Sequence, residues 1–171
     1  MPYINKGRNF TYGVVSTLSN VDSLVSPSAG DTVFCLENNR MMTFDGQVWM
    51  CSDFIKLINA SGSTLTRGDV VVVSNSTVGG VSTTSTSNNR LVVGPVVFGA
   101  TVNNPMAIAI SGIYSVRIAD STNAADIAYT SITSGAATST TSTSTGLFGV
   151  FVEQKSSGLA KCVIRPRTDV Y

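Results

Sequence analysis

The chain has 171 residues, of which 43% are hydrophobic and 12% are charged; its net charge is +1 and it contains no histidine. The charged share is about half of the roughly 25% usual in soluble proteins, and Ser and Thr make up a quarter of the chain. Lys and Arg are scattered, which argues against a nucleic acid-binding surface, and no apolar run is long enough to span a membrane. The N-terminal residues lack the apolar core of a signal peptide, so we expect synthesis in a cytoplasm.

Residues 1–31 are polar and mixed, and we interpret most of them as an extended arm. One short helix is predicted near residues 19–25, where Ser19 or Asn20 could serve as the N-cap. The arm ends in a turn-rich sequence, Ser-Pro-Ser-Ala-Gly-Asp, directly before the first strand signal.

Residues 32–52 give the clearest local signal of the chain. Three short strands are predicted at 32–37, 40–44 and 47–52. Asn38-Asn39 separates the first two and Asp45-Gly46 the last two. Both pairs tolerate positive φ, as two-residue hairpin turns require. The pattern therefore predicts a three-stranded meander.

The predicted registers assign apolar side chains to both faces of this meander. Cys35, Met42 and Trp49 lie on one face, and Leu36, Met41 and Met50 on the other. Three strands are too few to be stable alone, so the meander must pack on the next domain, on another copy or on a larger partner. The candidate docking and packing residues are Cys35, Met41, Met42, Trp49 and Met50. Trp49 could also stack on a sugar, although a role in packing fits the meander better.

The rest of the chain is predicted to be β structure. Residues 54–60 are expected to be a connector, which divides the chain into 1–54, an arm and meander for docking or oligomerisation, and 55–171, a β domain. Strand signals lie at 69–74, 90–100, 106–118, 126–131, 146–154 and 159–166. Gly94-Pro95 is expected to bend its strand or to place it at a sheet edge. Short strands at this spacing predict an all-β protein with an antiparallel β-sandwich or barrel.

Residues 80–96 and 135–151 resemble each other at an offset of 55, with Gly80 matching Gly135 and Gly94 matching Gly149. Each is preceded by a strand that opens at an aspartate. This order indicates either a structural duplication or two hairpins that look alike. If the duplication holds, the Ser/Thr tracts are hairpin strands or tips rather than linkers, and the core then includes Phe148, Val150 and Val152.

Residues for catalysis or metal binding are scarce. The commonest general base, histidine, is absent. Cys35, Cys51 and Cys162 lack the close spacing of a zinc site, and the first two should not be bridged, because a strand of the meander separates them. Arg67–Asp69 matches an integrin-binding tripeptide, but it lies where a turn enters a buried strand. We therefore expect no enzyme activity, no cofactor and no metal.

Residues 29–50 resemble a short module near the N-termini of phage tail and head fibre proteins. The matching positions are Gly30, Asp31, Asn38, Asn39, Phe44, Asp45, Gly46 and Trp49. Cys35 and Met41-Met42 are less typical of the module.

The later part, from Asn59 to Pro166, is similar to small capsid decoration proteins and head fibre bases, whose pattern is a succession of turn and strand signals such as GVFVE. This chain departs from that pattern at Ala125-Asp126, where Gly-Asp is favoured, and at Gly94-Pro95, where Gly-Val is favoured. The resemblance implies an all-β fold, homotrimers on the capsid surface and no catalysis.

Two functions remain in view. The first is a structural virion protein, a decoration or head fibre subunit that is bound to the major capsid protein on the capsid surface. Its residues 1–54 would dock on neighbouring subunits. The alternative is a tail fibre protein that binds a receptor or glycan. A depolymerase is disfavoured because the chain is short and has only ten carboxylate residues.

Overall fold

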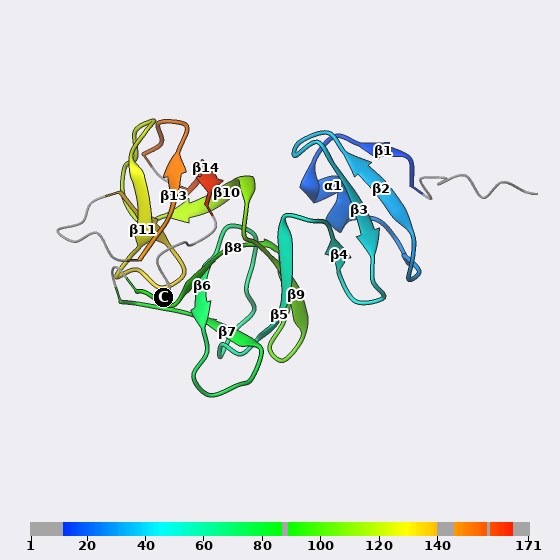
Figure 1. The fold of residues 1–171 in the computed structure, drawn as a ribbon, viewed down its shortest axis with the longest axis horizontal. Coiled ribbons are helices and arrows are strands. Elements are labelled where there is room, and N and C mark those ends of the chain that lie inside the picture. The colour runs from blue at the N-terminus through cyan, green and yellow to red at the C-terminus, as the bar shows by residue number, and fades with distance from the viewer. Residues whose placement is uncertain (1–11, 87–88, 140–145, 157, 166–171) are drawn as a thin grey trace, which may run out of the picture. The chain divides into compact units, whose positions relative to one another are not determined.

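The computed structural model describes residues 12–86, 89–139, 146–156 and 158–165 (Figure 1). In these residues, β-strands form nearly all of the regular structure, beside one short helix. The prediction of an all-β protein is confirmed. The chain divides into two compact units, Met1–Cys51 and Ser52–Tyr171.

The first unit is a sheet with the strand order β1-β2-β3-β4 and a helix packed on β1 and β2. Its elements are β1 (Val14–Val15), α1 (Leu18–Asp22), β2 (Thr32–Cys35), β3 (Arg40–Phe44) and β4 (Trp49–Met50). β1, which comes from the segment expected to be an arm, runs parallel to β2. The segment before the meander therefore extends its sheet and covers it with a helix.

The predicted short helix forms, but its N-cap is Thr17 rather than Ser19 or Asn20. The Thr17 hydroxyl oxygen accepts a hydrogen bond from the Asn20 amide, and the Asn20 side-chain oxygen accepts one from the Thr17 amide, both at 3.2 Å. This reciprocal capping satisfies two amides that a helix start leaves without partners. The helix buries Leu18 and Val21.

The first hairpin of the meander has a register two residues away from the expected one. Cys35 pairs with Arg40, where a two-residue turn would pair Cys35 with Met42. The turn is longer because Asn39, at φ +52°, is the residue of this loop that has a left-handed conformation, and its amide donates to the Leu36 carbonyl. Asn38 and Asn39 therefore do not form a two-residue turn by themselves.

The register of the second hairpin also differs from the expected one by two residues, because Phe44 lies opposite Trp49. The Asp45 carboxylate accepts hydrogen bonds from the amides of Gln47 and Val48, both at 2.9 Å, and so holds a wider loop. Side chains alternate between faces with a period of two, so a shift of two residues preserves both predicted faces.

The second unit contains two closed five-stranded barrels in place of the one sandwich or barrel expected (Figure 1). The first has the order β5-β7-β6-β8-β9 and the second β10-β12-β11-β13-β14. The first-barrel strands are β5 (Phe54–Asn59), β6 (Val70–Val73), β7 (Gly80–Thr83), β8 (Val92–Phe98) and β9 (Pro105–Ala109). The second-barrel strands are β10 (Gly112–Ile118), β11 (Ile127–Thr130), β12 (Ala137–Thr138), β13 (Leu147–Phe151) and β14 (Gly158–Ile164). Residues 54–60, expected to be a connector, thus supply a barrel strand.

The two barrels repeat one strand order, in which the first strand pairs in parallel with the third and antiparallel with the fifth. Their entry turns also match. The Asp69 carboxylate accepts a hydrogen bond from the Thr66 amide, and the Asp126 carboxylate accepts one from the Asn123 amide, both at 2.7 Å. Each aspartate therefore closes the turn that enters the second strand of its barrel.

The glycine correspondence needs one correction: Gly79, and not Gly80, is the counterpart of Gly135. Gly79 and Gly135 have φ of +67° and +73°, and each comes directly before the residue whose amide closes its turn. Gly94 and Gly149 do match, because each lies beside a bulge between the second and fourth strands. β8 lies between β6 and β9, so Gly94-Pro95 is in an interior strand and not at an edge.

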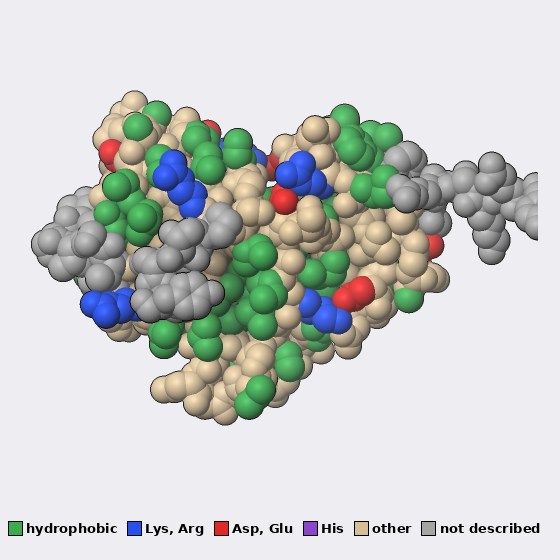
Figure 2. Space-filling view, in the orientation of Figure 1, with side chains coloured by type: hydrophobic (Ala, Val, Ile, Leu, Met, Phe, Trp, Pro, Cys, Tyr) green, Lys and Arg blue, Asp and Glu red, His purple; other side chains and the backbone are tan. Residues whose placement is uncertain are grey.

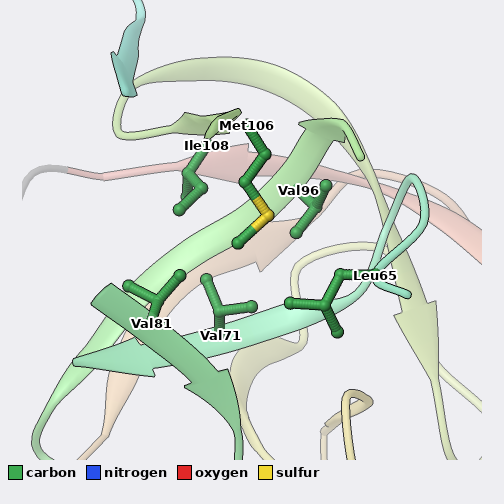
Figure 3. Close-up of a cluster of buried hydrophobic side chains, with 6 residues drawn as sticks. All are labelled: Leu65, Val71, Val81, Val96, Met106 and Ile108. Atoms are coloured by element: carbon green, nitrogen blue, oxygen red, sulfur yellow. The ribbon is translucent and has the colours of Figure 1, made fainter. Parts of the chain in front are cut away.

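The barrels fill equivalent core positions with different side chains. The first-barrel cluster consists of Leu65, Val71, Val81, Val96, Met106 and Ile108, all at most 2% exposed (Figure 3). The strand pairings place Thr122, Ala128, Ala137, Phe151, Ala160 and Cys162 at the corresponding positions, all 0% exposed. At these six positions the second barrel thus has one aromatic ring and five smaller residues. Burial raises the pKa of the Cys162 thiol to about 12, so the thiol stays neutral.

The expected core strand near residue 150 is only partly correct. Phe148 is buried, but Val150 is half-buried and Val152 is 45% exposed. The reason is the bulge beside Gly149, which breaks the simple alternation and turns Phe151 inward. Val150 and Val152 lie on the outer surface of the barrel instead.

Ala125→Gly is expected to raise the free energy of unfolding by about 0.5–1 kcal/mol. Ala125 is exposed and has φ +74°, whereas its counterpart in the first barrel is Gly68, at φ +89°. A left-handed conformation strains alanine, and this gain exceeds the entropy that glycine adds to the unfolded chain. Urea unfolding measures the difference. Ala124→Gly, an exposed neighbour without positive φ, should instead lower the stability; equal effects of both substitutions would contradict the prediction.

Candidate binding surfaces

The first unit separates the five candidate residues into a buried set and a surface set. Cys35 and Met42 are 0% exposed and Trp49 is 4% exposed, so these three belong to the core of the unit. The Trp49 ring contacts Tyr12 and Phe44, with ring centroids 6.0 and 5.4 Å apart. Trp49 therefore anchors packing and does not offer a free ring face to a sugar. Cys35, Cys51 and Cys162 are not joined by disulfides.

The surface set lies on the opposite face of the same sheet. Val14 of β1 is level with Phe34 of β2, which pairs with Met41 of β3. Val14 is 58% exposed and Met41 is 38% exposed; Phe34 and Met50 are half-buried. We call Val14, Phe34, Met41 and Met50 the outer face of the first unit. Sequence reasoning found Met41 and Met50 but missed Val14, because two residues of strand inside a polar segment give no periodic signal.

The members of this outer face are all apolar. In the view of Figure 2, charged side chains are few and hydrophobic ones reach the surface in the region of β1 and β2. Apolar side chains that are exposed or half-buried on neighbouring strands favour contact with another macromolecule over contact with water.

The tripeptide Arg67–Asp69 lies at the junction of the two barrels. Asp69 is 4% exposed, and its carboxylate is 3.1 Å from the Arg117 guanidinium of the second barrel. The Arg117 amide donates to the Gly68 carbonyl at 2.8 Å, and Arg67 donates to the Val97 carbonyl at 3.1 Å. These residues hold the barrels together, as expected for turn residues and unlike an accessible integrin motif.

The parts of the chain that the structure describes contain no cluster of three or more His, Cys, Asp or Glu arranged to hold a metal ion. In the same residues, no helix has the length and apolar character needed to cross a membrane.

No family model and no curated protein matches the chain. Among solved structures, the chain is similar to the N base of the head fiber gp8.5 of bacteriophage phi29, with 19% identity and a TM-score of 0.47 over 65% of this chain and 93% of that chain. It is also similar to the capsid of Myoviridae phage XM1, with 15% identity and a TM-score of 0.46 over 84% of this chain and 96% of that chain. Both of those structures are parts of phage particles.

Proposed function

We propose that the chain is a structural protein of a phage virion, a capsid decoration or head fibre subunit. It binds the major capsid protein through the first unit and acts as a homotrimer, as the sequence resemblance implies. The observation that supports capsid docking is the outer face of the first unit, where Val14, Phe34 and Met41 form an apolar row across three strands. Burial of such a row stabilises a complex by about 25 cal/mol per Å².

The role of each part follows from this arrangement. The first unit has its own core, so its outer face is available as a docking surface. The barrels project from the capsid or lie across it, and their Ser- and Thr-rich surfaces keep them soluble with little charge. Glycan binding is the weaker candidate, because Trp49, the single tryptophan of the chain, is buried.

The test is sedimentation of the purified full-length chain with capsids of its own phage that lack it. Met41→Lys is expected to weaken capsid binding by about tenfold or more, because an ammonium group would enter an apolar contact. Gln47→Lys, which adds the same charge in the exposed turn after β3, is the matched control and should bind normally. Circular dichroism confirms that both variants are folded.

Binding by Met41→Lys that equals the wild type would exclude this face as the docking surface. A wild-type chain that does not bind capsids at all would contradict the proposed function itself.

A further inference from the structure

The second barrel has an exposed apolar band on its outer surface. Ile113 pairs with Val163, Val163 with Val150, and Val150 with Ile127, so the band crosses four neighbouring strands. Ile113 is 52% exposed and Ile127 is 41% exposed, while Val150 and Val163 are half-buried. Val152, beyond the end of β13, is 45% exposed. We call these five residues the second-barrel band.

The equivalent band of the first barrel is buried. Its members, found from the same strand pairings, are Phe54, Val70, Pro95, Val97 and Ala109. Phe54 is 7% exposed, Val70 and Val97 are 1%, Ala109 is 0%, and Pro95 is also buried. Five apolar positions are therefore covered in one barrel and uncovered in the other, although the strands that bear them are arranged alike.

The second barrel is what covers the first-barrel band. The ring of Tyr114 contacts the ring of Phe54, with centroids 5.3 Å apart, and its hydroxyl donates to the Asp53 carboxylate at 3.1 Å. The Val70 amide donates to the Gly135 carbonyl at 2.9 Å. The Thr130 hydroxyl accepts a hydrogen bond from the Asn89 amide at 2.7 Å. The contact between the two barrels of one chain thus shows which kind of surface packs on such a band.

The surface of the second barrel that packs on the first-barrel band has an equivalent surface on the first barrel. Tyr114, Arg117, Thr130 and Gly135 of the second barrel correspond to Ile55, Ile58, Val73 and Gly79 of the first. Ile55 is 38% exposed, Ile58 37% and Val73 50%, and Val78, next to Gly79, is 100% exposed. The first barrel therefore presents an apolar surface where the second barrel makes its junction.

We propose that the second-barrel band of one copy binds the first barrel of another copy, through Ile55, Ile58, Val73 and Val78. The contact repeats between molecules the head-to-tail packing that the two barrels make within one molecule. It deepens the self-assembly part of the proposed function, because it assigns that assembly to the barrels rather than to the first unit.

The charges at the two contacts differ in a way that can be measured. Within the molecule, Asp69 pairs with Arg117; between molecules the corresponding residues are Asp126 and Ile58, which cannot form an ion pair. The Ile58 amide already donates to the Gly79 carbonyl at 3.0 Å, so side chains make the contact. Apolar association of this kind depends little on salt. Self-association should therefore persist in high salt.

The direct test is cross-linking between two variants that each have one cysteine introduced at the proposed contact. Ile113→Cys and Ile55→Cys are made separately in a Cys51→Ser background, since Cys35 and Cys162 are buried. They are then mixed and treated with a short bis-maleimide. The counterpart of the Phe54–Tyr114 contact predicts a covalent dimer in the mixture and none in either variant alone. A dimer from Ile113→Cys alone would indicate a two-fold contact of the band with itself and would overturn the proposal.

Sedimentation velocity of further variants separates this proposal from the proposed function. Ile127→Lys is expected to weaken self-association by about tenfold or more. Ile132→Lys, at an apolar position that is 74% exposed but outside the band, should have no effect, and neither should Met41→Lys. Assembly that survives Ile127→Lys and fails with Met41→Lys would overturn the proposal. If Ile127→Lys dissociates the assembly into single chains while the wild type does not bind capsids, the contact between barrels stands and only the proposed function is contradicted.

Discussion

Phe151→Ala is expected to lower the free energy of unfolding by about 4 kcal/mol. Phe151 is 0% exposed and is the large side chain among the six core positions of the second barrel that correspond to the first-barrel cluster. The other five positions hold Thr122, Ala128, Ala137, Ala160 and Cys162, which are too short to move into the space that the ring leaves. The cavity would therefore stay open, and an open cavity is the costly outcome of a large-to-small substitution. Urea unfolding followed by circular dichroism measures the loss.

The repeat supplies the control for this prediction. Val96 is the counterpart of Phe151 in the first barrel, where its neighbours are larger (Figure 3), and Val96→Ala should cost about 2 kcal/mol. Ala160→Met, which copies Met106 of the first barrel, should recover part of the stability in a Phe151→Val chain and should destabilise the wild type by overpacking. Additive effects of Phe151→Val and Ala160→Met would show that the two positions do not share one core.

Local pattern was enough to predict the three strands of the meander and their faces, because both depend on a period of two. Cys35, Met42 and Trp49 share a buried face although both hairpin registers differ from the expected ones by two residues. The registers themselves depend on side-chain hydrogen bonds in the turns. The two amides that donate to Asp45 are one example, and dipeptide preferences do not include such bonds.

The closure of two barrels in place of one was beyond the sequence signals. Closure depends on β12, which has only two residues in its described length, and on β5, which lies in a segment that looks like a connector. Both barrels close through a parallel pair of their first and third strands. Such a pair joins residues far apart in the chain and gives no local signal.

The candidate surfaces were the hardest part to predict. Phe54 and Ile113 are apolar residues at equivalent positions of the two barrels, yet one is 7% exposed and the other 52%. The difference comes from the packing of barrel on barrel, which a single sequence does not reveal. Met41 and Met50 were found because the meander has two apolar faces, and a face that its own unit leaves uncovered is a candidate for docking.

Gly94→Ala is expected to destabilise the chain by about 3 kcal/mol or more. A β-carbon at position 94 would overlap the carbonyl oxygen of Ala109 in the neighbouring strand β9. That obstacle is backbone, and it belongs to the sheet that closes the first barrel, so it cannot move aside without breaking strand pairing. Gly149→Ala should also destabilise the chain, because its β-carbon would lie 2.5 Å from the Val163 carbonyl oxygen at the equivalent place in the second barrel.

Gly62→Ala is the control, because a β-carbon at position 62 meets nothing within 4 Å. The free energy of unfolding of this variant, measured in urea, should stay within about 0.5 kcal/mol of the wild type. If Gly94→Ala behaved like Gly62→Ala, β8 and β9 could not approach each other as closely as the closed barrel requires.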